Sequence, residues 1–306
     1  MEIKRVEDRE KWIKFTKKQK ASFLQSWQWG EFKKEKQEVF RVGAFVDGEL
    51  AGVCQFFEEK VPFGSYFYCP YGPVTTQKLD SEEFLKSVQK NSEKETDFLR
   101  IEPLEKIEIG SKAFNRHQPS KTLIIDLKER EKLLAGFDKD TKYSIRRANR
   151  EGVEVEEATS VESFYKLLKK ASNRHGFGIY SKSYYEKLLK LDMVKLFEAT
   201  HEEDVLASAF AVFFGDTATY LHAGSSRKKR KFCGSSLLNF EIMCNGFEGG
   251  FSQYDFWGID EEEMPGVTKF KKGFGGKELV YPEAIDIPLN VKYQTYKKAY
   301  ALKSKL

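Results

Sequence analysis

The alternation of apolar and polar positions predicts two β-hairpins with similar surroundings. In the first, apolar residues dominate 41–46 and 50–57, and Asp47-Gly48 lies between the two runs. In the second, apolar runs at 195–200 and 205–214 flank a short polar turn. Asp-Gly between two apolar runs is a strong signal for a tight hairpin turn. We therefore expect an antiparallel strand pair in each half of the chain.

The elements that follow each hairpin also correspond. A short aromatic strand is predicted at 65–69 and again at 218–222, and a strand that ends in an acidic residue at 97–102 and 254–260. A helix fits between these strands in each half. Elements that recur in one order at a nearly constant offset indicate a duplicated domain. The predicted fold class is α/β (α+β), with two tandem domains that contain mixed twisted sheets.

The domain boundaries are expected where the pattern changes. A strand at 122–127 gives way to a charged helix, so the first domain is predicted at 1–128 and the second at 129–282. The remaining residues, 283–306, are typical of a strand followed by a basic helix.

Composition limits the class of protein. The chain has 306 residues, of which 32% are charged and 14% aromatic, and this is a globular composition. It has neither a bilayer-spanning run of roughly 20 apolar residues nor an apolar signal-peptide core, so we expect a cytoplasmic protein. Four cysteines and four histidines show no CxxC pair and no ligand spacing, so no metal site is predicted. His222, at the end of an aromatic strand, either lines a site or packs in the core.

Basic residues are concentrated in the second half. Lys142, Arg146 and Arg150 recur every fourth residue on one helical face, with Arg147 beside them. A second basic run occupies 227–231, and a third cluster consists of Lys269, Lys271, Lys272 and Lys277. Any one run is explained by a solvated face. Together, the three favour an anionic partner such as a polyphosphate or a nucleic-acid backbone.

Two segments carry candidate chemistry. At 254–276 an aromatic strand ends in an acid and is followed by a lysine-rich segment with glycines. Lysines beside flexible backbone can bind an anion or stabilise a developing oxyanion. A sheet edge with a solvated basic turn is the alternative. At 22–34 two tryptophans precede two lysines, so an aromatic anchor can hold a lysine toward a phosphate. The structural alternative is an amphipathic helix with buried aromatics, which is favoured for Trp27.

The ordered set of motifs resembles the FemABX family, the aminoacyl-tRNA-dependent transferases that build peptide bridges on cell-wall precursors. The matching segments cover nearly the whole chain and are 23–30, 142–155, 220–226, 254–258 and 270–275. The family fold has two domains that each resemble a GNAT acetyltransferase, which agrees with the repeat. The resemblance implies that 283–306 return to the first domain. The chain shows no sustained heptads, so it resembles a compact member without the coiled-coil arm.

The resemblance implies the reaction. An amine on the stem peptide of a muramyl pentapeptide attacks the ester of an aminoacyl-tRNA and forms an amide. Because the ester is already activated, neither a metal nor a coenzyme is expected, and aminoacyl-tRNA is the co-substrate. The acceptor is either UDP-linked or lipid-linked. A lipid-linked acceptor would require peripheral contact with the inner face of the membrane, for which the basic segment 292–305 is a candidate.

The resemblance also assigns residues to roles. Lys271, next to Phe270, is expected to stabilise the oxyanion. Lys33 is a candidate for the diphosphate of the precursor, and Glu102 for binding the peptide or accepting the proton of the nucleophile. Two of these residues have a structural alternative, namely a surface lysine for Lys271 and a strand-end acid for Glu102.

Further residues are assigned to the acceptor and to the donor. Tyr220 and Tyr184 match tyrosines of the acceptor site, and a buried strand tyrosine is the alternative for Tyr220. Tyr180 stands where the family often has an arginine. Arg174 or Lys182 is the candidate replacement for that phosphate contact. The expected tRNA-binding residues are Lys142, Arg146, Arg147 and Arg150.

Two other functions remain open. A GNAT-type acyltransferase would use acyl-CoA, but 231–236 keeps only the first glycine of the diphosphate-binding loop. A non-catalytic RNA-binding protein could keep the duplicated fold and the basic clusters. The amino acid transferred, the acceptor residue and the oligomeric state are not predicted.

Overall fold

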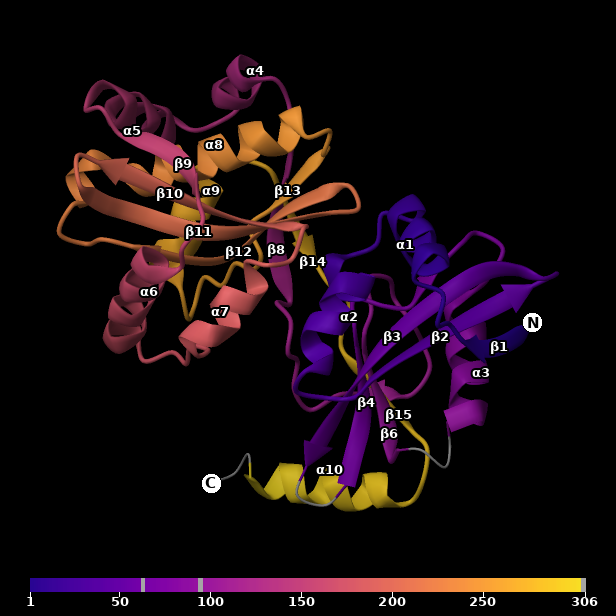
Figure 1. The fold of residues 1–306 in the computed structure, drawn as a ribbon. Helices are drawn as coiled ribbons and strands as arrows, with labels where there is room; N and C mark the ends of the chain where they lie inside the picture. The colour runs from indigo at the N-terminus through magenta and orange to yellow at the C-terminus, as the bar shows by residue number, and fades with distance from the viewer. Residues whose placement is uncertain (62–63, 93–95, 304–306) are drawn as a thin grey trace. The chain divides into compact units, whose positions relative to one another are not determined.

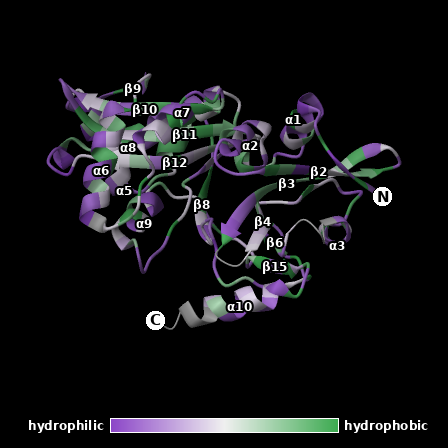
Figure 2. Cartoon of the chain, turned by 60° about the horizontal axis from the view of Figure 1, so that its bottom comes forward, coloured by the Kyte–Doolittle hydropathy of each residue, from purple (hydrophilic) through white to green (hydrophobic). Residues whose placement is uncertain are grey.

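The computed structural model describes residues 1–61, 64–92 and 96–303 and divides into two compact units (Figure 1). Unit 1 comprises Met1–Ser120 and Val280–Leu306, and unit 2 comprises Lys121–Leu279. Each unit has its own mixed sheet with helices packed on it. Strands β3, β11 and β12 contain stretches of hydrophobic residues. Along the helices, hydrophobic and hydrophilic residues alternate (Figure 2).

Unit 1 is built on a sheet of order β1-β2-β3-β4-β6-β15-β7, with β5 paired to β3. The strands are β1 (Glu2–Arg5), β2 (Val39–Val46), β3 (Glu49–Val61), β4 (Gly64–Pro70), β5 (Val74–Thr75), β6 (Phe98–Glu102), β7 (Ser111–Lys112) and β15 (Ile285–Pro288). The helices are α1 (Arg9–Lys18), η1 (Phe23–Gln25), α2 (Trp27–Lys34), α3 (Ser81–Ser92) and α10 (Lys292–Lys303). Strands β4 and β6 are parallel, and β15 runs antiparallel to β6.

The two faces of this sheet differ because successive side chains of a strand point to opposite sides. One face is apolar and packs against Phe84, Leu85 and Val88 of α3. The other face carries tyrosines and charged residues from β4, β6 and β15, and α10 packs on it through aromatic contacts such as Phe98–Tyr293. The residues of unit 1 that could bind a ligand or take part in a reaction therefore lie on the polar face.

Unit 2 is built on a sheet of order β14-β8-β13-β12-β11-β10-β9. The strands are β8 (Lys121–Asp126), β9 (Glu154–Ala158), β10 (Val194–His201), β11 (Asp204–Phe214), β12 (Thr217–Ser225), β13 (Gln253–Asp255) and β14 (Lys277–Val280). The helices are α4 (Arg130–Ala135), α5 (Lys139–Arg150), α6 (Glu162–His175), α7 (Lys182–Leu188), η2 (Arg230–Phe232), α8 (Gly234–Glu248) and α9 (Pro265–Lys272). Strand β12 is parallel to β13, while β10, β11 and β12 form an antiparallel meander.

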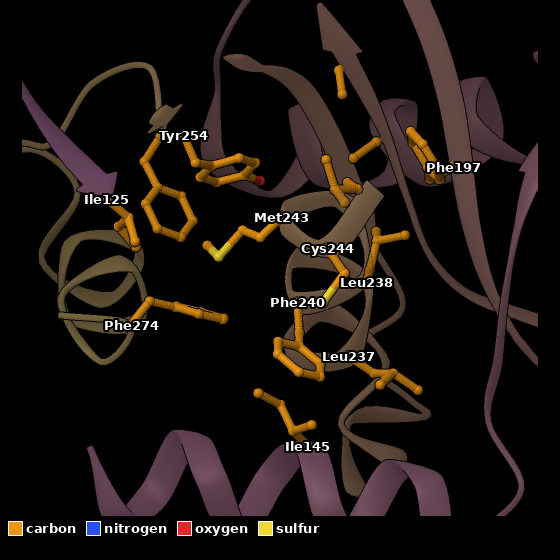
Figure 3. Close-up of a cluster of buried hydrophobic side chains, with 14 of the residues drawn as sticks. Ile125, Ile145, Phe197, Leu237, Leu238, Phe240, Met243, Cys244, Tyr254 and Phe274 are labelled. Carbon is orange, nitrogen blue, oxygen red and sulfur yellow. The ribbon is translucent and has the colours of Figure 1, made fainter. Parts of the chain in front are cut away.

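The core of unit 2 lies where α8 packs on the sheet. Helix α8 lies on one face with α5 beyond it, and α6 and α7 cover the opposite face (Figure 1). In the core, Met243 of α8 lies among Phe240, Tyr254 and Phe274 (Figure 3). Helix α8 is buried over most of its surface, which explains why its sequence is apolar on nearly every side.

The two predicted hairpins are confirmed. Both hairpins are present, since β2 pairs with β3 and β10 pairs with β11. Strand β15 lies beside β6, so the chain returns to unit 1 after unit 2. Within the described ranges, no helix has the length and apolar character needed to span a bilayer.

Other predictions need correction. The strand expected at 122–127 was placed in the first domain, but β8 pairs with β13 in the sheet of unit 2. The units therefore divide after Ser120 rather than at 128. The strand expected at 254–260 ends at Asp255, because the backbone turns at Trp257 with a φ of 53°. The lysine-rich segment that follows is the helix α9, so it is neither a basic turn nor a sheet edge.

Candidate functional site

Lys271 is a buried lysine, only 7% exposed, in the last turn of α9. Pro265 begins this helix, and its missing N–H costs nothing in the first turn. The Nζ atom of Lys271 donates to the backbone carbonyl of Phe256 at 2.8 Å and to that of Gly258 at 2.6 Å. The alternative of a surface lysine is therefore wrong.

The turn that accepts these hydrogen bonds is itself fixed. Oδ1 of Asp255 accepts from the hydroxyl of Thr122 at 2.5 Å and from the backbone N–H of Trp257 at 2.8 Å. The hydroxyl of Thr122 in turn accepts from the N–H of Gly258 at 3.1 Å. These contacts tie the end of β13 to β8 and point two carbonyls at Lys271.

Burial is the main influence on the charge of Lys271. It lowers the pKa of the ammonium to about 8, and the nearby carboxylate of Asp255 partly opposes this. At neutral pH the group is therefore mostly protonated. Since an ammonium has three N–H donors and two are engaged by carbonyls, one remains for a ligand.

Tyr220 faces the same aromatic cluster as the turn. Its ring centroid lies 6.0 Å from that of Phe256 and 6.4 Å from that of Tyr254. Burial raises the pKa of Tyr220 to about 12, so its hydroxyl is a neutral hydrogen-bonding group. Phe270, one turn of helix before Phe274, packs on it with ring centroids 5.3 Å apart. The structure thus brings Tyr220, Phe270 and Lys271 around Phe256 and Phe274.

A β-bulge sends the next residues of β12 to the other face. Phe210 of β11 is opposite His222, and Ala211 is opposite Tyr220, so Leu221 is the extra residue. His222 therefore meets α7, where its ring lies 5.5 Å from that of Tyr185. Burial lowers the pKa of His222 to about 4, so the imidazole is neutral.

Tyr184 is also on this face. It is 8% exposed, and its ring stacks on that of Tyr180 at 4.0 Å. Burial raises the pKa of Tyr184. Tyr180, which stands where the family often has an arginine, is 49% exposed, and it offers an aromatic face in place of a charge.

Of the two candidate replacements for that arginine, Arg174 is exposed and Lys182 is half-buried. The ammonium of Lys182 pairs with the carboxylates of Glu162 and Glu186, so its charge is already matched. Arg174 lies near the end of α6. The role of either residue in binding phosphate stays a prediction.

The two candidates in unit 1 differ in exposure. Lys33 is half-buried in the last turn of α2; burial lowers its pKa, and Glu59 partly offsets this. Glu102 is completely buried at the end of β6. Its Oε1 accepts from the backbone N–H of His117 at 2.5 Å, and its Oε2 from that of Gln118 at 2.9 Å. The carboxylate thus anchors a loop, and a role in proton transfer stays a prediction.

The expected nucleic-acid surface lies on α5. Arg146 and Arg150 are exposed, whereas Lys142 and Arg147 are half-buried. Helix α5 lies against η2, so the basic run 227–231 adjoins these residues. In the third basic cluster, Lys271 is buried and Lys272 pairs with Glu261 and Glu278, whereas Lys269 and Lys277 are exposed. In the described part of the chain, no group of three or more His, Cys, Asp or Glu side chains is arranged to hold a metal ion.

Comparison with known proteins identifies the family. The model of the FemAB family matches residues 8–113, 108–196 and 190–301, which together span most of the chain. The chain belongs to the FemAB family. One relative of this FemAB protein is the lipid II:glycine glycyltransferase of Staphylococcus saprophyticus, 23% identical over 83% of this chain and 85% of that protein. Another is the UDP-N-acetylmuramoylpentapeptide-lysine N(6)-alanyltransferase of Weissella viridescens, 25% identical over 47% of this chain and 46% of that protein.

Solved structures identify the fold of this FemAB protein. A crystal structure of FemX matches with a TM-score of 0.85 and 20% identity over 97% of this chain and 99% of that chain. A tandem GNAT protein from the clavulanic acid biosynthesis pathway matches with a TM-score of 0.57 and 9% identity over 94% of this chain and 98% of that chain. The fold is thus two tandem GNAT-like domains.

Sequence reasoning missed the residues that support the candidates. Asp255 and Thr122 fix the turn below Lys271, but they lie 133 residues apart, and no local pattern joins them. In unit 1, His117 belongs to the loop that Glu102 anchors, and its ring contacts Tyr66 and Tyr68. The alternation of Tyr66 and Tyr68 along one strand was the available signal, because such positions share a face.

Proposed function

We propose that this FemAB protein transfers an amino acid from aminoacyl-tRNA to an amine of a peptidoglycan precursor stem peptide. Family membership supports the proposal, as do relatives whose names describe glycyl and alanyl transfer to lipid II and to a UDP-linked muramoyl pentapeptide. The tandem GNAT-like fold is consistent with acyl transfer. The observation that carries the proposal is the buried ammonium of Lys271, which donates to the carbonyls of Phe256 and Gly258 in a turn where the ring of Phe256 packs on Tyr220.

The chemistry requires charge stabilisation more than activation. The amine nitrogen attacks the carbonyl carbon of the aminoacyl ester, and a tetrahedral intermediate with an oxyanion forms. Collapse breaks the ester C–O bond, releases the tRNA hydroxyl and leaves an amide, while the amine loses a proton. A preorganised donor aimed at the oxyanion stabilises this intermediate, and in our proposal the third N–H of Lys271 is that donor. Because the ester is activated, the reaction needs no coenzyme.

The test uses two adjacent lysines. Purified protein would be mixed with labelled aminoacyl-tRNAs and, in separate reactions, a UDP-linked and a lipid-linked muramyl pentapeptide, with acetyl-CoA in parallel. We expect Lys271→Ala to reduce transfer by about 10²–10³-fold, the usual effect of removing one oxyanion donor. Lys272→Ala is the control, because this ammonium is exposed and pairs with Glu261 and Glu278. Equal rates for Lys271→Ala and wild type would remove Lys271 from the mechanism. Consumption of acetyl-CoA without transfer from tRNA would indicate the acyl-CoA reaction instead.

We also propose that α5 and the adjacent run 227–231 form the surface for the tRNA backbone. The triple substitution of Lys142, Arg146 and Arg150 by alanine should weaken tRNA binding. It should also reduce the slope of log affinity against log salt by roughly 2–3, since each lost phosphate contact contributes about 0.7–0.9. Arg147 is left intact so that this variant and its control remove the same number of charges.

The matched control for the surface is on the other face of the same unit. Lys166, Lys169 and Lys170 are exposed on α6, and their replacement by alanine removes the same charge. We expect this control to keep the affinity of the wild type. If both triple variants lose affinity equally, net charge rather than the α5 surface determines binding.

A further inference from the structure

One peptide group in unit 2 lies between two buried charged side chains. Its carbonyl is that of Phe256, which accepts from Nζ of Lys271 at 2.8 Å. Its N–H is that of Trp257, which donates to Oδ1 of Asp255 at 2.8 Å. Asp255 is 5% exposed and Lys271 is 7% exposed. The carboxylate therefore meets one end of the peptide dipole, and the ammonium meets the other end.

The hydrogen bonds around Asp255 favour its ionised form. The hydroxyl of Thr122 accepts from the N–H of Gly258 at 3.1 Å and donates its own proton to Oδ1 of Asp255 at 2.5 Å. The same oxygen accepts from Trp257, and donors that converge on a carboxyl oxygen stabilise the carboxylate. Burial raises the pKa of Asp255, and these two hydrogen bonds and the charge of Lys271 oppose the rise.

The turn that contains this peptide group has a conformation that needs support. Trp257 has a φ of 53° and Gly258 a φ of 98°, and the left-handed region is unfavourable for a residue with a side chain. The N–H groups of the turn are held by Asp255 and Thr122, and two of its carbonyls by Lys271. Side chains on both sides of the turn therefore stabilise this conformation.

Asp255 also acts on the charge of Lys271. Burial lowers the pKa of Lys271 to about 8, and the charge of Asp255 opposes this change. Hydrogen bonds in a series polarise one another, so the carboxylate makes the carbonyl of Phe256 a stronger acceptor. The other titratable groups on the adjoining segments are neutral, paired or hydrogen-bonded, namely Lys121, Asp138, Tyr220, Tyr254, Asp260 and Lys272.

We propose that Asp255 is a positioning residue for Lys271, whose carboxylate acts through the peptide group between Phe256 and Trp257 to direct the ammonium and keep it charged during transfer. Because the carbonyls of Phe256 and Gly258 take two N–H groups of Lys271, the position of this peptide group also sets the direction of the third. The inference rests on the proposed function, which assigns that third N–H to the oxyanion.

The kinetic test is the pH dependence of transfer by Asp255→Asn. The amide keeps the size of the side chain and one acceptor oxygen but removes the charge. We expect the pKa of Lys271 to fall by about 1 or more, the usual effect of losing a nearby opposite charge. The ratio of wild-type to Asp255→Asn turnover should then rise by about eightfold from pH 6 to pH 9, because less of the variant's lysine is charged.

Two further variants separate charge from structure. Thr122→Val removes a hydroxyl from the same turn without changing its charge, so its loss of activity should be the same at every pH. Asp260→Asn removes a carboxylate that accepts from two N–H groups of the next loop, at 2.8 Å each, and should keep the wild-type rates. A loss by Asp255→Asn that does not vary with pH would overturn the inference, because Asp255 would then only support the fold.

A double substitution tests whether Asp255 acts through Lys271. In the Lys271→Met background, Asp255→Asn should have no further effect on transfer. An additional loss of the same size as in wild type would mean that the two residues act independently. Circular dichroism would check that each variant is folded. If the amide does not fold, Asp255→Ser replaces it, because serine is uncharged and can also accept from the N–H two residues later.

A measurement without substrates keeps the inference separate from the proposed function. With lysine labelled with ¹³C at Cε, NMR would follow Lys271 between pH 6 and pH 11, and Lys271→Met would identify its signal. We expect a midpoint at about 8 in wild type and a lower midpoint in Asp255→Asn. Equal midpoints would overturn the inference even if the protein catalyses transfer. A lower midpoint in a protein that transfers nothing would refute only the proposed function.

Discussion

Raising the pH should make unit 2 more stable and the protein less active, because both changes follow from Lys271. Its pKa lies at about 8, whereas the ordinary value is 10.5. The perturbation is therefore a pH increase combined with the substitution Lys271→Met, which removes the titrating group and keeps an apolar side chain of similar length. The two properties respond in opposite directions.

The change in activity follows from the protonated fraction. With a pKa of about 8, roughly nine-tenths of the lysine is charged at pH 7 and about one-tenth at pH 9. If only the ammonium stabilises the oxyanion, the ratio of wild-type to Lys271→Met initial rates should fall about tenfold over this range. Using the ratio cancels the deprotonation of the attacking amine, which changes both enzymes alike. Rates would be normalised to the aminoacyl-tRNA that is still esterified.

The change in stability has the opposite sign. Because the pKa of Lys271 is lower in the folded protein, the unfolded chain binds more protons between pH 8 and 10.5, and stability rises with pH in this window. The shift corresponds to about 3 kcal/mol in total. We expect the free energy of unfolding in urea to rise by about 2–3 kcal/mol from pH 7 to pH 10, relative to Lys271→Met. If neither difference changes with pH, Lys271 titrates normally and is not buried as described.

Three other predictions concern the support of the sites. Asp286→Asn should destabilise unit 1 by about 3–5 kcal/mol in urea unfolding, because Arg100 would stay buried without its partner, and a loss below 1 kcal/mol would contradict this. Glu102→Gln should speed hydrogen exchange of the backbone N–H of His117, because only one of the two polar atoms of the glutamine side chain can accept a hydrogen bond. An unchanged exchange rate would mean that other contacts hold the loop. Tyr143 is 57% exposed on the basic helix α5, so its ring can stack on a base of the tRNA. Tyr143→Ala should therefore weaken tRNA binding by about fivefold or more, whereas Tyr143→Phe should keep the wild-type affinity. Equal losses of affinity in the two variants would exclude stacking.

The sequence was informative wherever a pattern is local. The hairpins were predictable because Asp47-Gly48 and the apolar runs lie within a few residues of one another. The partner of β8 was not, because the strand pairs with β13, more than a hundred residues later. An apolar strand next to a domain boundary fits either sheet equally well by its composition.

For the candidate sites, the sequence suggests which residues to consider but not the environment of each one. Lys271 could be chosen from the family motif, but its burial depends on carbonyls that a turn at Trp257 directs toward it. His117 was indistinguishable from any other isolated histidine, because its neighbours come from β4 and β6. The helix α9 was missed because glycines around a lysine-rich segment also suggest a turn.

The position of β15 has a consequence for how the protein is made. Arg100 meets Asp286 only after another 186 residues have left the ribosome, which takes roughly 10–40 s at ordinary elongation rates. Unit 2 is continuous from Lys121 to Leu279, so its whole sequence emerges during that delay. During this time the guanidinium of Arg100 is not paired with Asp286, and the edge of the sheet beside β6 is open. Unit 1 therefore completes its fold last, although most of it is translated first.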